Sequence, residues 1–169
     1  QVRFDGSHKR DAYIVGTLSE YFEFHPFCPE VAIGLGIPRP TIHLVKIDNA
    51  IRCVGIKDLT LDVTDRLRDY AEQQKDSHAE LCGYILKKDS PSCGMERVKV
   101  YAGNQPHRNG FGIYAQEMMR NNPLLPVEEE GRLGDPGLRE NFIQRVYVLY
   151  RWKQLLAEGL SAQSLTRFH

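Results

Sequence analysis

The chain has 169 residues, of which 22 are Lys or Arg and 22 are Asp or Glu, so its formal net charge is zero. This balance argues against a broad basic surface that coats nucleic acid, although a local basic patch is compatible with it. Hydrophobic residues make up 41% of the chain, which is ordinary for a globular protein with one full domain. No run of about 18 apolar residues occurs, so we expect no membrane-spanning helix.

The amino-terminal residues lack the apolar segment of a signal peptide, and the four cysteines form no C-x-x-C pair. Both features favour free or ligating thiols in a reducing compartment over disulfides or a zinc ribbon. We therefore expect a cytoplasmic protein. Because the chain starts without Met, in what reads as the middle of a domain, we also expect a further segment before Gln1.

The predicted elements alternate between strands and helices. Strands are expected over residues 21–25, 41–47, 83–87 and 98–101, and helices from residue 29, over 62–75 and over 112–120. This order predicts an α/β fold with a mainly parallel, Rossmann-like sheet flanked by helices. In such sheets functional loops gather beyond the carboxyl ends of the strands.

The pattern becomes purely helical beyond residue 136. Apolar residues recur there at spacings of three and four, up to Gly159. We expect residues 1–136 to form the α/β domain without its first segment. Residues 137–169 are then the first helices of a truncated carboxyl-terminal helical domain.

Two short loops carry the residues with the most chemical potential. Cys28 lies two residues before Glu30, and Cys93 ends a turn that contains Ser90 and Ser92. Two thiols and a carboxylate could form a metal site with an acid or base beside it. From the residues alone, each cysteine could equally be a small buried hydrophobe, and Glu30 could simply favour a helix amino terminus.

Several motifs in order resemble the bacterial thiouracil desulfidase family. They are VRFDGSHKR (2–10), FCPE (27–30), GIPRP (36–40), GYILKKDSPSCG (83–94) and LPVEEEGRL (125–133). Residues 139–152 resemble the start of a helical domain that is often fused behind this one. The fused arrangement is similar to that of the tRNA 4-thiouridine desulfidases.

The resemblance implies a [4Fe-4S] cluster that is held by three cysteines and has one iron open to substrate sulfur. Two ligands map onto Cys28 and Cys93, and the third is expected upstream of Gln1. Neither Cys53 nor Cys82 matches a ligand position, and we expect both to be buried thiols. The implied catalytic residues are Glu30, as acid or base, and Ser90 or Ser92, between which the sequence does not decide. Candidate substrate contacts are Asp5, Lys9, Arg39 and Lys88.

The implied function is a non-redox, iron-sulfur-dependent desulfidase that hydrolyses the C–S bond of thiolated uracil and releases sulfide. The expected substrate is 4-thiouridine in tRNA, and free 2-thiouracil is the alternative. Because the net charge is zero, we expect most affinity for tRNA to come from residues beyond His169. A different class of function also remains open, namely a non-catalytic α/β module that binds nucleic acid or another ligand without a cluster.

Overall fold

A four-stranded sheet forms the centre of the computed structural model, which describes residues 11–103 and 105–168. Its strand order is β2-β1-β4-β5, from β1 (Ile42–Ile47), β2 (Ala50–Gly55), β4 (Val98–Ala102) and β5 (Gln105–Gly110). Strands β1 and β4 run parallel, whereas β1–β2 and β4–β5 are antiparallel hairpins. Asp48 and Asn49 both have positive φ, which suits the two-residue turn between β1 and β2.

A second, smaller sheet carries the chain toward the cysteine loop. Strands β3 (Tyr84–Leu86) and β6 (Val127–Glu129) pair in parallel, with Leu86 opposite Glu129. Because parallel strands end at the same edge, the loop after β3 and the loop after β6 lie next to each other. This arrangement places residues 87–94 beside the acidic run at 128–130.

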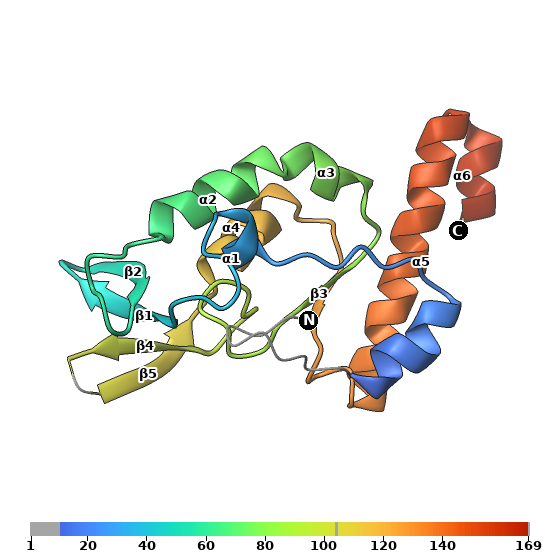
Figure 1. Cartoon of the computed structure of the whole chain (residues 1–169). Helices are drawn as coiled ribbons and strands as arrows, with labels where there is room; N and C mark the ends of the chain where they lie inside the picture. The colour runs from blue at the N-terminus through green and yellow to red at the C-terminus, as the bar shows by residue number, and fades with distance from the viewer. Residues whose placement is uncertain (1–10, 104, 169) are drawn as a thin grey trace.

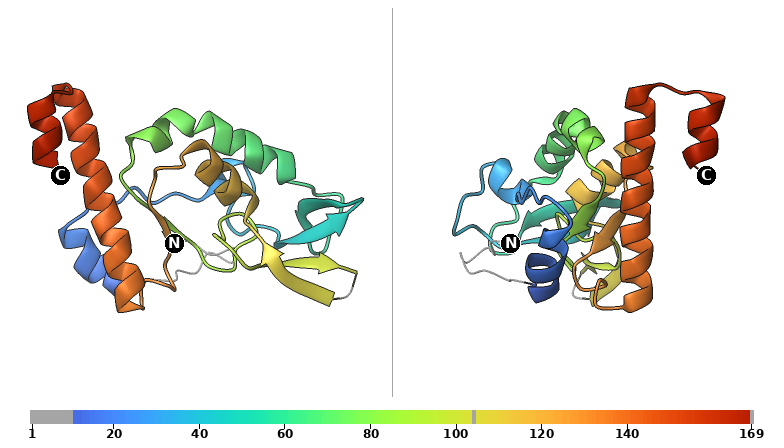
Figure 2. Two further views of the ribbon diagram at one scale, coloured as in Figure 1. Left: turned by 180° about the vertical axis from the view of Figure 1, so that it is seen from behind. Right: turned by 90° about the vertical axis from the view of Figure 1, so that its right-hand side faces the viewer.

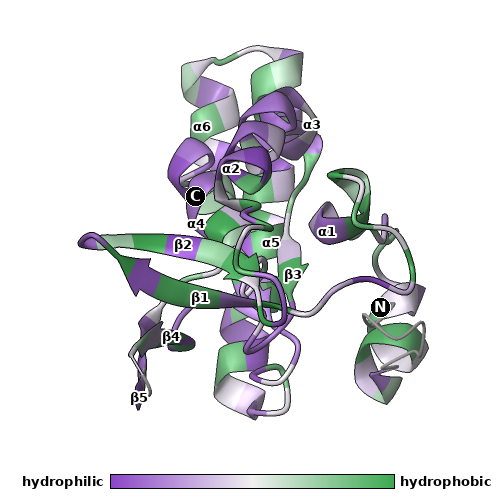
Figure 3. Ribbon diagram, turned by 60° about the vertical axis from the view of Figure 1, so that its left-hand side comes forward, coloured by the Kyte–Doolittle hydropathy of each residue, from purple (hydrophilic) through white to green (hydrophobic). Residues whose placement is uncertain are grey.

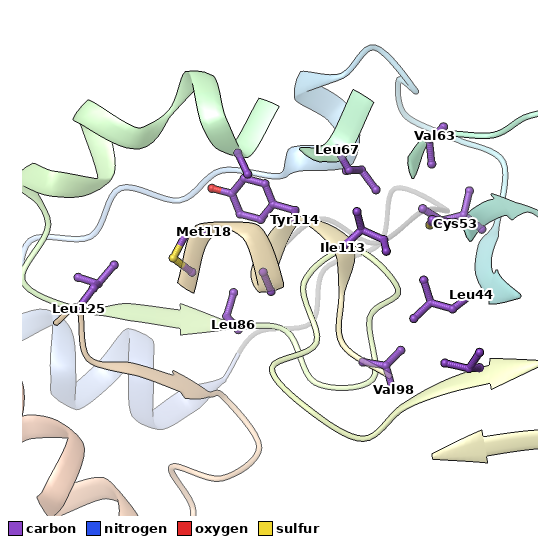
Figure 4. Close-up of a cluster of buried hydrophobic side chains, with 14 residues drawn as sticks. Leu44, Cys53, Val63, Leu67, Leu86, Val98, Ile113, Tyr114, Met118 and Leu125 are labelled. Carbon is purple, nitrogen blue, oxygen red and sulfur yellow. The ribbon is translucent and has the colours of Figure 1, made fainter. Parts of the chain in front are cut away.

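Three helices cover the strands on one side (Figure 1): α2 (Thr64–Gln73), α3 (Lys75–Glu80) and α4 (Ile113–Asn121). Helix α2 buries Leu67 and Ala71 and is hydrophilic on the surface visible in Figure 3, so its amphipathic pattern explains its position. Figure 4 shows side chains of both sheets, including Leu44 and Leu86, meeting residues of α2 and α4 in the main core. A short helix, α1 (Pro29–Ala32), follows Cys28.

A second apolar cluster joins the two ends of the described chain. The π-helix η1 (Tyr13–Thr17) and the 3-10 helix η2 (Leu18–Glu20) lie beside the first half of α5 (Pro136–Glu158), as Figure 2 shows. The cluster consists of Leu18, Leu133, Phe142 and Val146. Helix α5 starts at a Pro after Asp135, whose side chain accepts from the Leu138 N–H. Helix α6 (Ala162–Phe168) folds back on α5.

The expected α/β class, with a central sheet flanked by helices and a helical carboxyl-terminal region, is confirmed. Two details differ. The sheets are mixed, because the two hairpins add antiparallel pairs. The strand expected over 21–25 is wrong: residues 22–28 have no regular structure, since this segment finds no strand to pair with. The predicted helix over 62–75 is confirmed as α2, with the shorter α3 directly behind it.

The division of the chain at residue 136 stays a prediction. Helix α5 begins at Pro136, yet its first turns pack on the α/β part through Phe142 and Val146. No helix in the described parts of the chain combines the length and the apolarity needed to cross a membrane.

Candidate active site

The two cysteine loops meet at one cavity. Its volume is about 260 Å³, near the lower end of the range for small-molecule pockets. Three segments line it, namely 27–30, 39–42 and 84–93, and both Cys28 and Cys93 belong to them. Cys28 stands immediately before α1, and Pro29 takes the first helical position, where its missing N–H costs nothing.

The turn that carries Cys93 is held by α4 and by two glycines. The Ile113 and Ala115 amides of α4 donate to carbonyls of the turn, which satisfies N–H groups that a helix start leaves without partners. A Cβ at Gly94 would lie 2.3 Å from Val98 Cγ2, and a Cβ at Gly112 would lie 2.6 Å from the Cys93 nitrogen. Both positions therefore require glycine for this close packing.

Glu30 is the centre of a chain of polar side chains beside the thiols. Only 9% of its surface is exposed. Its Oε2 accepts from Arg39 Nε at 2.5 Å, and its Oε1 accepts from Ser92 Oγ at 2.6 Å. Ser90 Oγ lies 3.0 Å from Ser92 Oγ and accepts from the Cys93 N–H at 3.1 Å.

The hydroxyl protons of Ser90 and Ser92 have one consistent arrangement. Ser92 has a single hydroxyl proton, and the short, charge-assisted bond to Glu30 is stronger than the 3.5 Å approach to Cys93 Sγ. Ser92 therefore donates to Glu30 and accepts from Ser90. The result is a directed relay, Ser90 to Ser92 to Glu30, in which Ser92 touches the carboxylate and Ser90 stands one step behind.

Two of the four cysteines line the cavity and two do not. Burial, and to a lesser degree the negative charges of Glu30 and Cys28, raise the pKa of the Cys93 thiol to about 12. A bound cation would offset this cost and favour the thiolate. Cys53 lies in the main core, and burial raises its pKa as well, whereas Cys82 packs against the second apolar cluster. Neither of these two lines the cavity.

The donor set fits two of the three ligand positions that the resemblance implies. Cys28 and Cys93 supply soft sulfur donors to the same cavity, which suits iron in a cluster. Within residues 11–103 and 105–168, no group of three His, Cys, Asp or Glu side chains could hold a metal ion.

The expected substrate contacts have different surroundings. Lys88 lines the cavity with an exposed side chain, and its backbone N–H donates to Glu130 at 2.7 Å. Arg39 also lines the cavity, but its guanidinium holds Glu30, which adds a positioning role to the expected one. Asp5 and Lys9 lie outside the described residues.

Sequence analysis missed the residues that clamp the cysteine turn from the other side. Glu128, Glu129 and Glu130 are all buried. Glu129 accepts from the Met95 N–H at 2.9 Å, and Glu130 pairs with Lys87 in addition to binding Lys88. The available signal was three consecutive carboxylates at a strand end, which cannot all face away from the core.

Comparison with known proteins agrees with this geometry. The 2-thiouracil desulfurase family matches residues 1–130, which is most of the chain and includes every segment of the cavity. This chain belongs to the 2-thiouracil desulfurase family. The resemblance of the motifs to the thiouracil desulfidase family is thereby confirmed.

A solved structure supports the assignment to the 2-thiouracil desulfurase family. The chain is similar to the [4Fe-4S]-dependent thiouracil desulfidase TudS, with 27% sequence identity and a TM-score of 0.61 over 85% of this chain and 90% of that one. The expectation of an enzyme is confirmed at this level, since this member of the family is related to an enzyme. No curated protein matches the chain.

Proposed function

We propose that this member of the family is a [4Fe-4S]-dependent, non-redox desulfidase that converts thiolated uracil to uracil with release of sulfide. The observation that carries the proposal is the gathering of Cys28, Cys93, Glu30 and Ser92 around one cavity. A buried carboxylate with a hydroxyl relay beside two thiols has the groups that general acid–base chemistry at a metal site requires.

Cys28 and Cys93 would hold the cluster, together with a third cysteine before Gln1. When bound there, such a cluster would supply soft Lewis-acid chemistry that activates the C=S bond. Glu30 takes a proton from the attacking water as general base. Its ion pair with Arg39 keeps the carboxylate in place before the reaction. The proton that Glu30 has taken is then passed through the Ser92 hydroxyl to the departing sulfur, so the carboxylate and the hydroxyl are both restored.

For the substrate we propose 4-thiouridine in tRNA. A small basic surface at the mouth of the cavity supports it. The hydrogen bond from Arg108 lowers the pKa of Asp89, and the charges of Lys88 and Lys99 lower it further. Three cations around one carboxylate leave a local positive excess where a polynucleotide phosphate could bind, next to a cavity for its base. Lys88 would make this contact, with Asp5 and Lys9 as further substrate contacts.

Free 2-thiouracil is the second candidate, because the family is named for it. The two candidate substrates can be distinguished by whether their turnover depends on the basic surface. Desulfidation of 4-thiouridine in tRNA should fall with salt and in Lys99→Ala, whereas turnover of the free base should not.

The first experiment measures iron and acid-labile sulfide, anaerobically, on protein that includes the upstream segment. We expect about four of each per chain. Cys28→Ala and Cys93→Ala should lose most of both, while Cys82→Ala, a thiol outside the cavity, should keep them. Absence of iron after careful reconstitution, or equal loss in all three variants, would contradict the proposal.

A further inference from the structure

A chain of three aromatic and imidazole groups leads from the core to the wall of the cavity. His78 of α3 is buried, with 3% of its surface exposed, and its Nε2 lies 2.6 Å from the Tyr114 hydroxyl of α4. That hydroxyl lies 3.3 Å from the hydroxyl of Tyr84. Tyr84 belongs to β3 and is one of the residues that line the cavity. The relay around Glu30 uses none of these three side chains.

The tautomer of the His78 imidazole determines which group donates and which accepts in these hydrogen bonds. Nδ1 of His78 is buried without a hydrogen-bond partner in the described structure. Orphaned buried N–H groups are rarer than under-satisfied acceptors, so the favoured tautomer carries its proton on Nε2. Burial lowers the pKa of His78, which keeps the ring neutral with that one proton.

The remaining hydrogens follow from this tautomer. Nε2–H donates to the Tyr114 oxygen, so the Tyr114 hydroxyl must direct its own proton to Tyr84. Tyr84 then accepts from Tyr114, and its O–H is left as a donor. Burial raises the pKa of both phenols, so both keep their protons. Among the described residues Tyr114 is the one hydrogen-bond partner of the Tyr84 hydroxyl.

Aromatic packing holds the phenol of Tyr84 in place at the cavity wall. Phe27, the neighbour of Cys28, packs edge-on against the rings of Tyr84 and Tyr114 at centroid distances of 6.0 and 5.7 Å. His78 meets the same two rings at 5.9 and 5.8 Å. A donor that is held on both sides is pre-organised, so little freedom is lost when it binds a substrate.

We propose that Tyr84 donates a hydrogen bond to the carbonyl oxygen that the thiolated pyrimidine keeps during the reaction, and that Tyr114 and His78 position this donor. The inference rests on the proposed function and adds a determinant of substrate specificity to it. In a 2-thiouracil ring the retained carbonyl is at C4, and in a 4-thiouracil ring it is at C2. Recognition of this oxygen distinguishes a thiolated uracil from a thione that lacks it.

The test compares 2-thiouracil with pyrimidine-2-thione, which lacks the retained carbonyl, on the cluster-loaded full chain. Tyr84→Phe should lower kcat/KM for 2-thiouracil by about tenfold and leave that for pyrimidine-2-thione unchanged. It should weaken the binding of uracil, the product, by a similar factor, which is a readout independent of turnover. Iron content should not change, and the midpoint of thermal unfolding should fall only slightly, because the Tyr114 hydroxyl loses its acceptor.

Tyr114→Phe tests the positioning role. It should have a smaller effect in the same direction, and the double variant Tyr84→Phe/Tyr114→Phe should be no worse than Tyr84→Phe alone. Tyr70→Phe is the matched control, because the Tyr70 ring packs in the same aromatic group, 6.0 Å from Tyr114. It should behave as the wild type.

The outcomes separate this inference from the proposed function. Suppose that the wild type is active and that Tyr84→Phe lowers kcat/KM equally for both thiones, or for neither. The inference is then overturned while the proposed function stands. If the loaded wild type turns over neither 2-thiouracil nor 4-thiouridine in tRNA, the proposed function fails. In that case, weaker binding of uracil by Tyr84→Phe would still support Tyr84 as the hydrogen-bond donor to the carbonyl oxygen.

Discussion

Glu30 and Glu130 are both buried carboxylates that hold the same cysteine turn, but from different sides and with different partners. Glu130 accepts from the Lys88 N–H and pairs with Lys87 at the start of the turn. Glu30 accepts from Arg39 and from the hydroxyl of Ser92. Glu30 lines the cavity with the two thiols, and Glu130 does not.

The difference shows that burial of a carboxylate does not by itself indicate catalysis. A backbone amide and an ammonium group only hold Glu130, because neither passes a proton onward at neutral pH. A hydroxyl can donate and accept at the same time, so the partners of Glu30 make a relay. The two carboxylates thus differ in the kind of donor that they bind and in their access to the cavity, and this difference is the basis of the role proposed for Glu30.

The largest expected effect is on turnover. Glu30→Gln should lower kcat by about 10² to 10⁴, because the amide can keep a hydrogen bond to Ser92 but cannot take a proton. Single-turnover release of sulfide from the iron-loaded protein measures this. Glu130→Gln is the matched control and should cost far less activity. Equal losses in the two variants would remove the functional distinction between the two carboxylates.

The next effect is on stability. The side chains of Arg39 and Glu30 are 5% and 11% exposed. Arg39→Gln leaves a buried carboxylate without its counter-charge and should lower the free energy of unfolding by about 3–5 kcal/mol. Denaturant unfolding measures this, and the double variant Arg39→Gln/Glu30→Gln should recover part of the loss. A double variant as unstable as the sum of the single ones would show that the two side chains are not coupled.

A smaller effect should separate the two serines. Ser92→Ala removes the hydroxyl that touches Glu30 and should lower kcat by about 10². Ser90→Ala removes the group one step behind it and should cost about tenfold. The measurement is kcat for both variants at equal iron content. The reverse order would assign the contact with the reacting atoms to Ser90.

The smallest effect is the pH dependence of stability at the structural acids. Burial raises the pKa of Glu129 above its ordinary 4.5. The folded state thus holds this proton more tightly, so its stabilisation is complete below the unfolded pKa and is lost as pH rises through the folded pKa. Glu129→Gln keeps an acceptor for the Met95 N–H and lacks this titration. Between pH 4 and about 7.5, the free energy of unfolding of the variant should rise relative to that of the wild type as pH rises. A constant difference would contradict a raised pKa.

The chain order and local pattern were sufficient to predict much of this protein. The apolar spacing in residues 62–75 and 112–120 predicted α2 and α4, and Pro29 predicted the start of α1. The strand predicted over 21–25 was wrong, because its aromatic residues favour a strand but no partner strand lies beside it. Its neighbour Phe27 packs instead with Tyr70, Tyr84 and Tyr114.

The sequence by itself determined the family and the candidate residues, because these depend on short motifs whose residue types are visible in order along the chain. Only the tertiary structure decided the contacts between them. Ser92 is 62 residues from Glu30, and one 2.6 Å contact shows that Ser92 rather than Ser90 touches the carboxylate. The pairing of Arg39 with Glu30, and the link from His78 through Tyr114 to Tyr84, likewise join separate elements. Such contacts depend on how strands and helices pack, which no local pattern specifies.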